Sequence, residues 1–72
     1  MAAITVLAID AEDANRHFLA QLLQKKNYAV KEAATGEVGI NMVGEAAPSL
    51  IIFDSKLPDV TVMELIERFK RP

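Results

Sequence analysis

Two short apolar runs, each ending at an aspartate, constrain the fold of this chain more than any other feature. Residues 4–9 read Ile-Thr-Val-Leu-Ala-Ile and stop at Asp10, while residues 49–53 read Ser-Leu-Ile-Ile-Phe and stop at Asp54. Continuous apolar runs of this length, rich in β-branched side chains, are typical of strands that are buried on both faces. Strands of this kind belong to parallel sheets covered by helices, so we expect an α/β fold.

The first helix is predicted over residues 14–26, with Asp13 as its N-cap. Its apolar stripe is expected to consist of Phe18, Leu19, Leu22 and Leu23. Arg16 falls off this stripe, and we expect it on another face of the helix. Asn27 follows the helix and tolerates the left-handed backbone conformation that often ends one.

The rest of the chain continues the alternation of strands and helices. Residues 28–33 alternate in polarity, which favours an edge strand. A second helix is expected over residues 37–45, weakened by Gly39 and Gly44 at about 1 kcal/mol each. A third begins at a capping box, Thr61-Val62-Met63-Glu64. The order β-α-β-α-β-α predicts a single domain with a parallel sheet and right-handed crossovers.

Composition excludes several classes of protein. The 72 residues suffice for one small domain, and 51% hydrophobic with 25% charged residues is an ordinary globular mixture. The absence of cysteine excludes disulfides and thiolate metal sites. A net charge of −2 argues against nucleic acid as a partner. No apolar run approaches the roughly 18 residues of a membrane span, and we see no signal peptide, so we expect a cytoplasmic protein without membrane contact.

The two aspartates that end the apolar strands are the main candidates for a functional site. Ligands of open parallel sheets bind beyond the carboxyl ends of the strands, where Asp10 and Asp54 would meet if their strands are neighbours. Glu12 and Asp13 lie near the same rim, and such oxygen ligands suit Mg²⁺. The alternative is that these acids only cap a helix or end a strand, and their spacing alone does not decide between the two interpretations.

Three segments together resemble the receiver domain of bacterial two-component response regulators. Residues 6–16 are similar to the first strand and acidic turn of that family, and residues 28–37 to its second strand and the Ala-x-Gly-Glu start of its second helix. Residues 48–59, Pro-Ser-Leu-Ile-Ile-Phe-Asp-Ser-Lys-Leu-Pro-Asp, resemble its third strand, phosphoacceptor and following loop. The resemblance extends over the whole chain.

The resemblance implies a flavodoxin-like, CheY-like sheet with strand order 2-1-3 and a role in phosphorelay signalling. Asp54 would accept a phosphoryl group from a histidine kinase or a phosphotransfer protein. Asp10, Asp54 and the backbone carbonyl of Lys56 would bind Mg²⁺, and Leu57 and Pro58 would shape the loop. The chain would act as a signalling module and not as an enzyme, with no catalytic residue of its own.

The chain also departs from the family pattern. Ala11 stands where the family usually has a second acid, so Mg²⁺ binding is expected to be weak unless Glu12 or Asp13 substitutes. The resemblance implies five strand–helix units, of which this sequence holds three, so we expect an incomplete receiver whose exposed third strand favours self-association. These departures leave open a second hypothesis, a degenerate receiver that acts as an interaction module without phosphotransfer.

Overall fold

The central element of the fold is the first strand of a three-stranded parallel sheet. The computed structural model describes residues 4–70. Their elements, in chain order, are β1 (Thr5–Ile9), α1 (Asp13–Lys25), β2 (Ala29–Ala33), α2 (Gly36–Glu45), β3 (Leu50–Phe53) and α3 (Val62–Lys70). The sheet has the order β2-β1-β3 with both pairs parallel, which confirms the predicted alternation and strand order.

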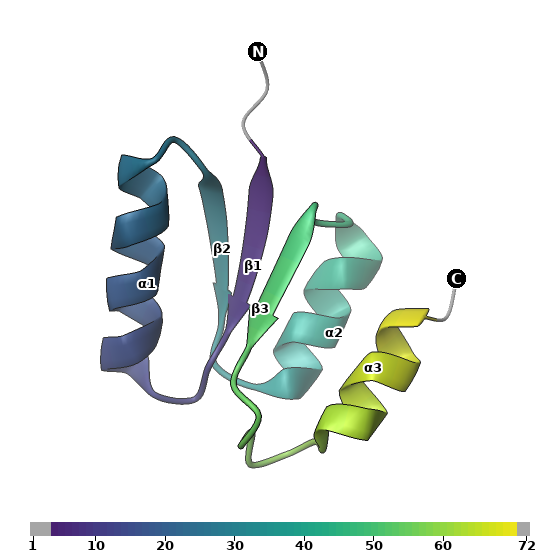
Figure 1. Cartoon of the computed structure of the whole chain (residues 1–72). Helices are drawn as coiled ribbons and strands as arrows, with labels where there is room; N and C mark the ends of the chain where they lie inside the picture. Colours follow the sequence, from purple (N-terminus) through teal and green to yellow (C-terminus); the bar gives the residue numbers. More distant parts are fainter. Residues whose placement is uncertain (1–3, 71–72) are drawn as a thin grey trace.

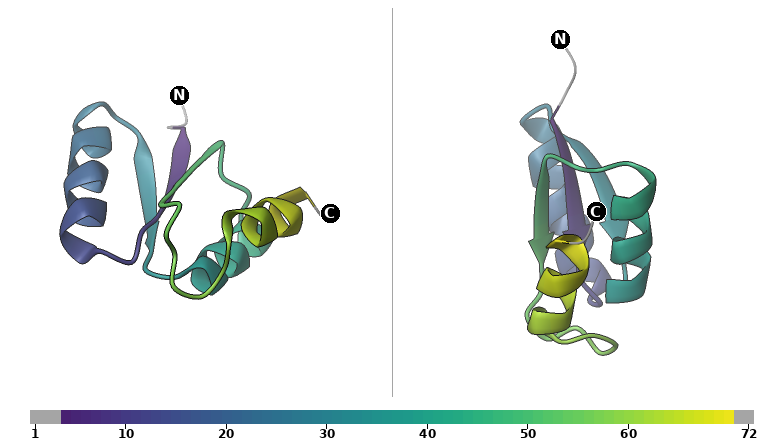
Figure 2. Two further views of the ribbon diagram at one scale, coloured as in Figure 1. Left: turned by 60° about the horizontal axis from the view of Figure 1, so that its bottom comes forward. Right: turned by 90° about the vertical axis from the view of Figure 1, so that its right-hand side faces the viewer.

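The helices cover the two faces of the sheet unequally. Helix α1 lies on one face, and α2 and α3 lie side by side on the other (Figures 1 and 2). The loops that follow the carboxyl ends of the three strands all lie at the same end of the molecule, at the bottom of Figure 1. No helix within residues 4–70 is long and apolar enough to cross a membrane.

The register of the sheet aligns the carboxyl ends of its strands. Ile9 of β1 pairs with Ala33 of β2 on one side and with Phe53 of β3 on the other. The residues that follow β1 and β3, Asp10 and Asp54, therefore leave the sheet at the same level.

Strand β1 forms the centre of the core. Its residues Val6 to Ile9 are at most 1% exposed, as expected for a strand that is covered on both faces. Leu7 and Ile9 form the core cluster on the α2 side together with Ala33. Half-buried side chains from other elements pack against that cluster: Met42, Val43, Ile51, Phe53, Leu57 and Phe69.

The start of α1 differs from the prediction. The helix begins at Asp13 and Glu12 is its N-cap, so the assignment of Asp13 as N-cap is wrong. The carbonyl of Glu12 accepts the first helical hydrogen bond, from the amide of Arg16 at 3.0 Å. The carboxylate of Asp13 is not a cap because it pairs with the Arg16 side chain instead. At the other end, Asn27 has the expected left-handed conformation, with φ of 69°.

The buried face of α1 also differs from the predicted stripe. Phe18 and Leu22 are 64% and 46% exposed, while the buried residues are Arg16 and Ala20. Ala20 has a small side chain that allows close approach of the helix to the sheet, and Arg16 turns toward β2, where Glu32 accepts its hydrogen bond. The stripe prediction therefore holds only for the half-buried Leu19 and Leu23.

The caps of α2 and α3 lie close to the predicted positions. Thr35 is the N-cap of α2, and its hydroxyl accepts a hydrogen bond from the amide of Val38 at 3.2 Å. In α3, the Thr61 hydroxyl accepts from the amide of Glu64 at 3.1 Å and donates to the Glu64 carboxylate at 3.1 Å. The first contact confirms the half of the capping box in which Thr61 caps the helix, while the Glu64 carboxylate accepts from the Thr61 hydroxyl and not from the Thr61 amide.

Candidate functional site

Asp10 and Asp54 are brought together by the hydrogen bonds that end the sheet. The amide of Asp54 donates to the carbonyl of Ile9 at 3.0 Å, and the amide of Asp10 donates to the carbonyl of Ala33 at 3.0 Å. Both acids thus stand one residue past the last paired position of their strands. This placement agrees with the prediction that they meet at one rim of the sheet.

Each of these carboxylates also orders the loop that follows it. Oδ1 of Asp10 accepts a hydrogen bond from the amide of Glu12 at 2.8 Å, and Oδ1 of Asp54 accepts one from the amide of Lys56 at 3.2 Å. Contacts of this kind, from an aspartate to the amide two residues later, are Asx turns. They hold both half-buried side chains in fixed orientations at the rim.

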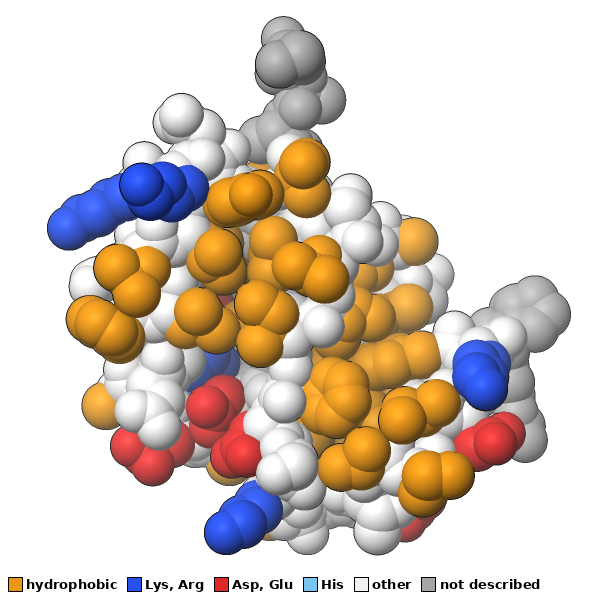
Figure 3. Space-filling view, in the orientation of Figure 1, with side chains coloured by type: hydrophobic (Ala, Val, Ile, Leu, Met, Phe, Trp, Pro, Cys, Tyr) orange, Lys and Arg blue, Asp and Glu red, His pale blue; other side chains and the backbone are white. Residues whose placement is uncertain are grey.

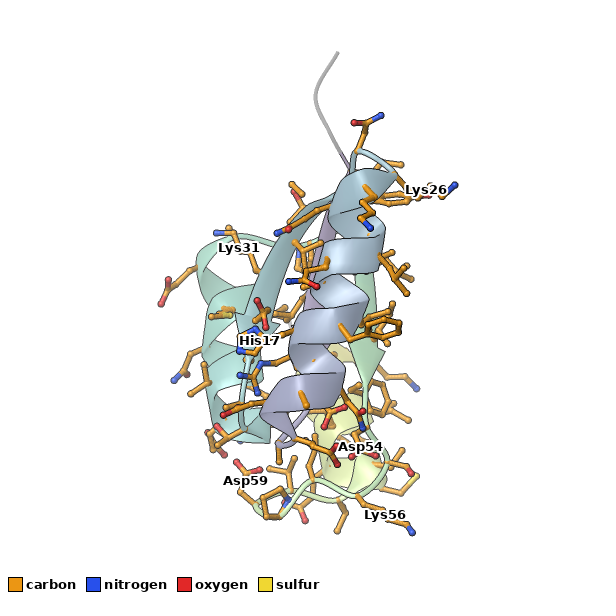
Figure 4. All side chains as sticks on the ribbon, turned by 90° about the vertical axis from the view of Figure 1, so that its left-hand side faces the viewer. His17, Lys26, Lys31, Asp54, Lys56 and Asp59 are labelled. Atoms are coloured by element: carbon orange, nitrogen blue, oxygen red, sulfur yellow. The ribbon has the colours of Figure 1, made fainter. Side chains whose placement is uncertain are left out.

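A cavity of about 200 Å³ opens between α1, β1 and β3 beside these acids. Its lining residues are Ala8, Ile9, Asp10, Asn15, Arg16, Leu19, Ile52, Phe53 and Asp54. Figure 4 shows Asp54 at the lower end of α1, at the rim described above. The cavity therefore offers a polar end with two carboxylates and an apolar wall formed by the sheet.

Arg16 also lines this cavity, and the helical pattern of the sequence did not indicate it as a residue of the candidate site. Its guanidinium donates from Nη1 to the carbonyl of Asp10 at 2.7 Å, from Nη2 to Oδ1 of Asp13 at 2.7 Å and from Nε to Oε1 of Glu32 at 3.1 Å. The hydrogen bond with Asp13 is the largest cause that raises the pKa of Arg16 above its ordinary value, so the group stays charged. The buried guanidinium of Arg16 therefore lines the same cavity as Asp10 and Asp54, and its hydrogen bond to the Asp10 carbonyl holds the turn that carries Asp10. The spacing of Asp13 and Arg16, three residues apart on a helix, is the signal in the sequence that indicates this pair.

His17 belongs to the edge of this cluster. Its Nδ1 lies 2.9 Å from Oε1 of Glu32, the same oxygen that accepts from Arg16, and its side chain is more than half exposed. The contact is an ion pair only when the imidazole is protonated.

Two of the predicted metal ligands share the cavity, and the two substitute acids do not complete a cluster with them. Within the part of the chain that the structure describes, no three Asp, Glu or His side chains lie close enough to hold a metal ion together. Asp13 is paired with Arg16, and Glu12 is exposed. Asp10 and Asp54 are nevertheless oxygen donors of the type that Mg²⁺ prefers, and Mg²⁺ is commonly bound by one or two carboxylates with waters. The residues present therefore fit a weak Mg²⁺ site.

The remaining predicted site residues lie in the loop between β3 and α3. The Lys56 side chain is exposed and points away from Asp54 in Figure 4, so its ammonium does not pair with the acids. Leu57 packs against the core cluster, while Pro58 is exposed. Asp59, the last residue of the segment that resembles the family's third strand and loop, accepts hydrogen bonds from the amides at the start of α2.

Apolar and acidic side chains separate on the surface around the cavity. Figure 3 shows an apolar field over α1 and the neighbouring sheet, with acidic side chains below it, at the end where the strand carboxyl ends lie in Figure 1. The large exposed apolar residues of α1 and β3 include Phe18, Leu22 and Leu50. Leu50 belongs to β3, the edge strand of the described sheet on the side opposite β2.

Comparison with known proteins identifies sequences and structures similar to this chain. Residues 6–72 match the sequence model of the response regulator receiver domain. The transcriptional regulatory protein AfsQ1 of Streptomyces coelicolor is 34% identical over 67 residues, which are 93% of this chain and 30% of that protein. The chain therefore spans less than a third of the length of this relative.

Solved structures show the same fold. The chemotaxis response regulator CheY4 of Vibrio cholerae superposes with a TM-score of 0.87 at 29% identity, over 92% of this chain and 55% of that one. The receiver domain of Ssk1 of Saccharomyces cerevisiae, crystallised with the histidine phosphotransfer protein Ypd1, gives a TM-score of 0.84 at 27% identity, over 92% and 46%. The match to CheY4 confirms the flavodoxin-like, CheY-like fold and its strand order.

Proposed function

This chain belongs to the response regulator receiver domain family, and from that premise we propose that it accepts a phosphoryl group on Asp54. One observation carries the proposal: Asp54 stands at the carboxyl end of β3, beside Asp10, at the polar end of the same cavity. An aspartate that is held by a backbone hydrogen bond and opens onto a cavity is positioned to act as a nucleophile.

The proposed step transfers a phosphoryl group from a phosphohistidine to Asp54. A carboxylate oxygen of Asp54 attacks phosphorus in line with the P–N bond. The new O–P bond forms as the P–N bond breaks, and the electron pair of that bond stays on the imidazole nitrogen, which takes up a proton from water. Such transfers need mainly positioning and charge neutralisation from the protein, and the Asx turn of Asp54 supplies the positioning.

Receiver domains in general bind Mg²⁺ at their acidic pocket. In this chain Asp10, Asp54 and the backbone carbonyl of Lys56 would hold the ion, with waters in its other positions. When bound, Mg²⁺ neutralises the negative charge that gathers on the phosphoryl oxygens during transfer. Ala11 supplies no carboxylate, so we propose that this chain binds Mg²⁺ more weakly than it would with an acid at that position.

The partner that we propose is a histidine kinase or a phosphotransfer protein. Receiver domains in general interact with such proteins, and the Ssk1 receiver was crystallised with a histidine phosphotransfer protein. The family consists of signalling modules, so we propose that the chain signals by a change in conformation or assembly and does not act as an enzyme. Its place of action would be the cytoplasm, and no nucleic acid or membrane would be bound by this segment.

Strand β3 offers a second proposed contact, with another copy of the chain. Within residues 4–70 it pairs with β1 along one side only, and Leu50 on this strand is 51% exposed. An edge strand with apolar side chains is a template for pairing with another strand. We propose that this edge takes part in self-association.

Intact mass spectrometry tests the proposed phosphotransfer. The chain is incubated with Mg²⁺ and an acyl phosphate as small phosphodonor, and the Asp54→Asn variant is treated in parallel. We expect the unsubstituted chain to gain the mass of one phosphoryl group and Asp54→Asn to gain none. Glu45→Gln, at the exposed end of α2 and away from the cavity, serves as the matched acid-to-amide control.

Two outcomes would contradict the proposal. If Asp54→Asn gains the same mass as the unsubstituted chain, another group accepts the phosphoryl group. If neither chain gains mass while the unsubstituted chain still binds a phosphotransfer protein, the result supports the degenerate receiver that acts as an interaction module.

A further inference from the structure

The loop between β3 and α3 is attached to the start of α2 by one carboxylate. Oδ1 of Asp59 accepts a hydrogen bond from the amide of Gly36 at 3.0 Å, and Oδ2 accepts one from the amide of Glu37 at 2.9 Å. These groups are more than 20 residues apart in the chain. The contact therefore joins two loops that both follow carboxyl ends of strands.

Asp59 and Thr35 together accept hydrogen bonds from the first three amides of α2. The first amides of a helix have no partner within the helix. The Asp59 carboxylate accepts hydrogen bonds from the amides of Gly36 and Glu37, and the Thr35 hydroxyl accepts one from the amide of Val38. The amide of Gly39 donates to the carbonyl of Thr35 at 3.1 Å. The Asp59 carboxylate also lies at the positive end of the helix dipole, which favours its charged form. Two caps thus act on one helix end, one local and one from the loop that carries the proposed site.

A close steric fit fixes the same junction. Val60 is buried, and a Cβ atom on residue 36 would overlap Cγ2 of Val60 and lie 3.2 Å from Oδ1 of Asp59. Only glycine at position 36 leaves room for this approach of the loop. On the α3 side, Nη1 of Arg68 lies 3.7 Å from Oε1 of Glu37.

The loop is held at both ends, and the proposed site lies at one of them. At its start the amide of Lys56 donates to Asp54. Only Leu57 and Pro58 separate Lys56 from Asp59. Leu57 packs against the core, and the ring of Pro58 restricts the backbone at its own position. A displacement of Asp59 is therefore transmitted to Lys56 through two residues with little freedom.

We propose that Asp59 is a positioning residue of the proposed phosphoacceptor site: its hydrogen bonds to Gly36 and Glu37 hold the loop so that Lys56 stays in place beside Asp54. The inference rests on the proposed function of Asp54. Through Asp59 the start of α2 helps to position the loop beside Asp54, although no residue of α2 lines the cavity.

Two substitutions at the same helix end separate positioning from stability. Asp59→Asn removes the charge and leaves a single side-chain oxygen to accept hydrogen bonds, where Asp59 has two. Thr35→Ala removes the local cap of α2 and leaves the contact between Asp59 and α2 intact. Both variants lose a cap and are expected to lose stability. Only Asp59→Asn is expected to slow phosphorylation of Asp54, by about tenfold, because small misplacement of a reacting group is costly in rate.

A readout without phosphorylation makes the test independent of the proposed function. In ¹H–¹⁵N spectra recorded without phosphodonor, Asp59→Asn is expected to shift the amide signals of Ser55 and Lys56, and Thr35→Ala is expected to leave them in place. Titration with Mg²⁺ is expected to show a higher midpoint for Asp59→Asn than for Thr35→Ala.

Each outcome decides one of the two proposals. If the unsubstituted chain is not phosphorylated on Asp54, the proposed function fails, and the Ser55 and Lys56 signals still decide whether Asp59 holds the loop. If Asp59→Asn and Thr35→Ala give the same loop signals and the same rate, the positioning role is wrong. Should Asp59→Asn not fold, Asp59→Glu, which keeps the carboxylate but lengthens the side chain, is compared in the same two measurements.

Discussion

Gly39 of α2 lies directly against Ile9 of β1. A Cβ atom on residue 39 would stand 2.8 Å from Cγ1 of Ile9 and would overlap its Cδ1. Ile9 is almost fully buried, so its side chain has no room to move aside. By contrast, a Cβ on Gly44, in the same helix, would meet no atom within 4 Å. Two glycines that look alike in the sequence thus have different roles.

Alanine substitutions at these two positions should change stability in opposite directions. Gly39→Ala is expected to lose up to about 2 kcal/mol, because overpacking costs ~1–3 kcal/mol and helix propensity returns ~1. Gly44→Ala is expected to gain about 0.5–1 kcal/mol, since nothing obstructs the new methyl group. Urea unfolding followed by circular dichroism measures both, and equal gains for the two variants would contradict the close contact with Ile9.

Substitution of Arg16 should destabilise the fold more than substitution of an exposed arginine. Arg16→Met removes three hydrogen bonds of a 7% exposed side chain. We expect a loss of about 1–3 kcal/mol, toward the lower end because Asp13 is largely exposed and water screens that pair. The control is Arg68→Met, whose half-exposed ion pair with Glu37 is expected to contribute less than about 1 kcal/mol. Unfolding free energies measured side by side would contradict this role of Arg16 if the two losses were equal.

An acid at position 11 should strengthen Mg²⁺ binding. Ala11 directly follows Asp10 and is exposed, so Ala11→Asp adds a carboxylate to the turn beside the site. We expect the dissociation constant for Mg²⁺ to fall by about tenfold, because affinity rises with the number of charged oxygen ligands. Ala14→Asp adds the same charge in the first turn of α1 and controls for general attraction of cations. Calorimetric or NMR titration with Mg²⁺ compares the two variants. Equal effects would show that the added carboxylate acts only by long-range electrostatic attraction and not as a ligand.

Protonation of Asp59 should weaken the fold in acid. The hydrogen bonds from the amides of Glu37 and Gly36 lower the pKa of Asp59 from its ordinary value of 3.8. The unfolded chain therefore takes up this proton at a higher pH than the folded chain does. The stabilisation is complete above pH 3.8 and is lost as the pH falls through the lower pKa of the folded state.

Unfolding curves measured between about pH 2 and 6 test this dependence. The unsubstituted chain is expected to lose stability below pH 3.8 more steeply than Asp59→Asn, which has no proton to bind at that position. Parallel curves for the two proteins over the whole range would show that the Asp59 carboxylate is not held by these amides.

A positive charge on the edge of β3 should reduce self-association. Leu50→Lys places an ammonium group on the edge strand, where such charges oppose pairing with another strand. Met63→Lys, on α3, makes a similar change at an apolar side chain that is 66% exposed, and it serves as the control. We expect sedimentation or light scattering to show a lower dimer fraction for Leu50→Lys only. A loss of dimer in Met63→Lys instead would assign the contact to α3.

The sequence predicts those parts of the fold that depend on local patterns. The apolar runs before Asp10 and Asp54 predicted two strands, and the Thr61–Glu64 spacing predicted the start of α3. The expected burial on both faces holds for β1 and is wrong for β3, an edge strand in the described sheet whose residues are half-buried or exposed. The strand order came from the family resemblance, and the meeting of Asp10 with Asp54 follows once β1 and β3 are neighbours.

The errors and omissions concern contacts between distant segments. Arg16 was assigned to a polar face because its partner on β2, Glu32, is 16 residues away and no helical pattern includes it. No local pattern connects Asp59 with the start of α2, because its two partners lie 23 and 22 residues earlier in the chain. Phe18 was placed in the buried stripe because helical spacing shows which residues share a face, but not which face meets the sheet.

The central position of β1 also determines the order in which the sheet can be built. During synthesis β1, the most buried strand of the described sheet, emerges before both of its neighbours, β2 and β3. A parallel pair requires a crossover, so β1 has no partner until residues 29–33 have followed, and its second side stays open until residues 50–53 are made. The nascent chain therefore leaves one side of β1, the most buried strand of the described sheet, unpaired until residues 50–53 have emerged.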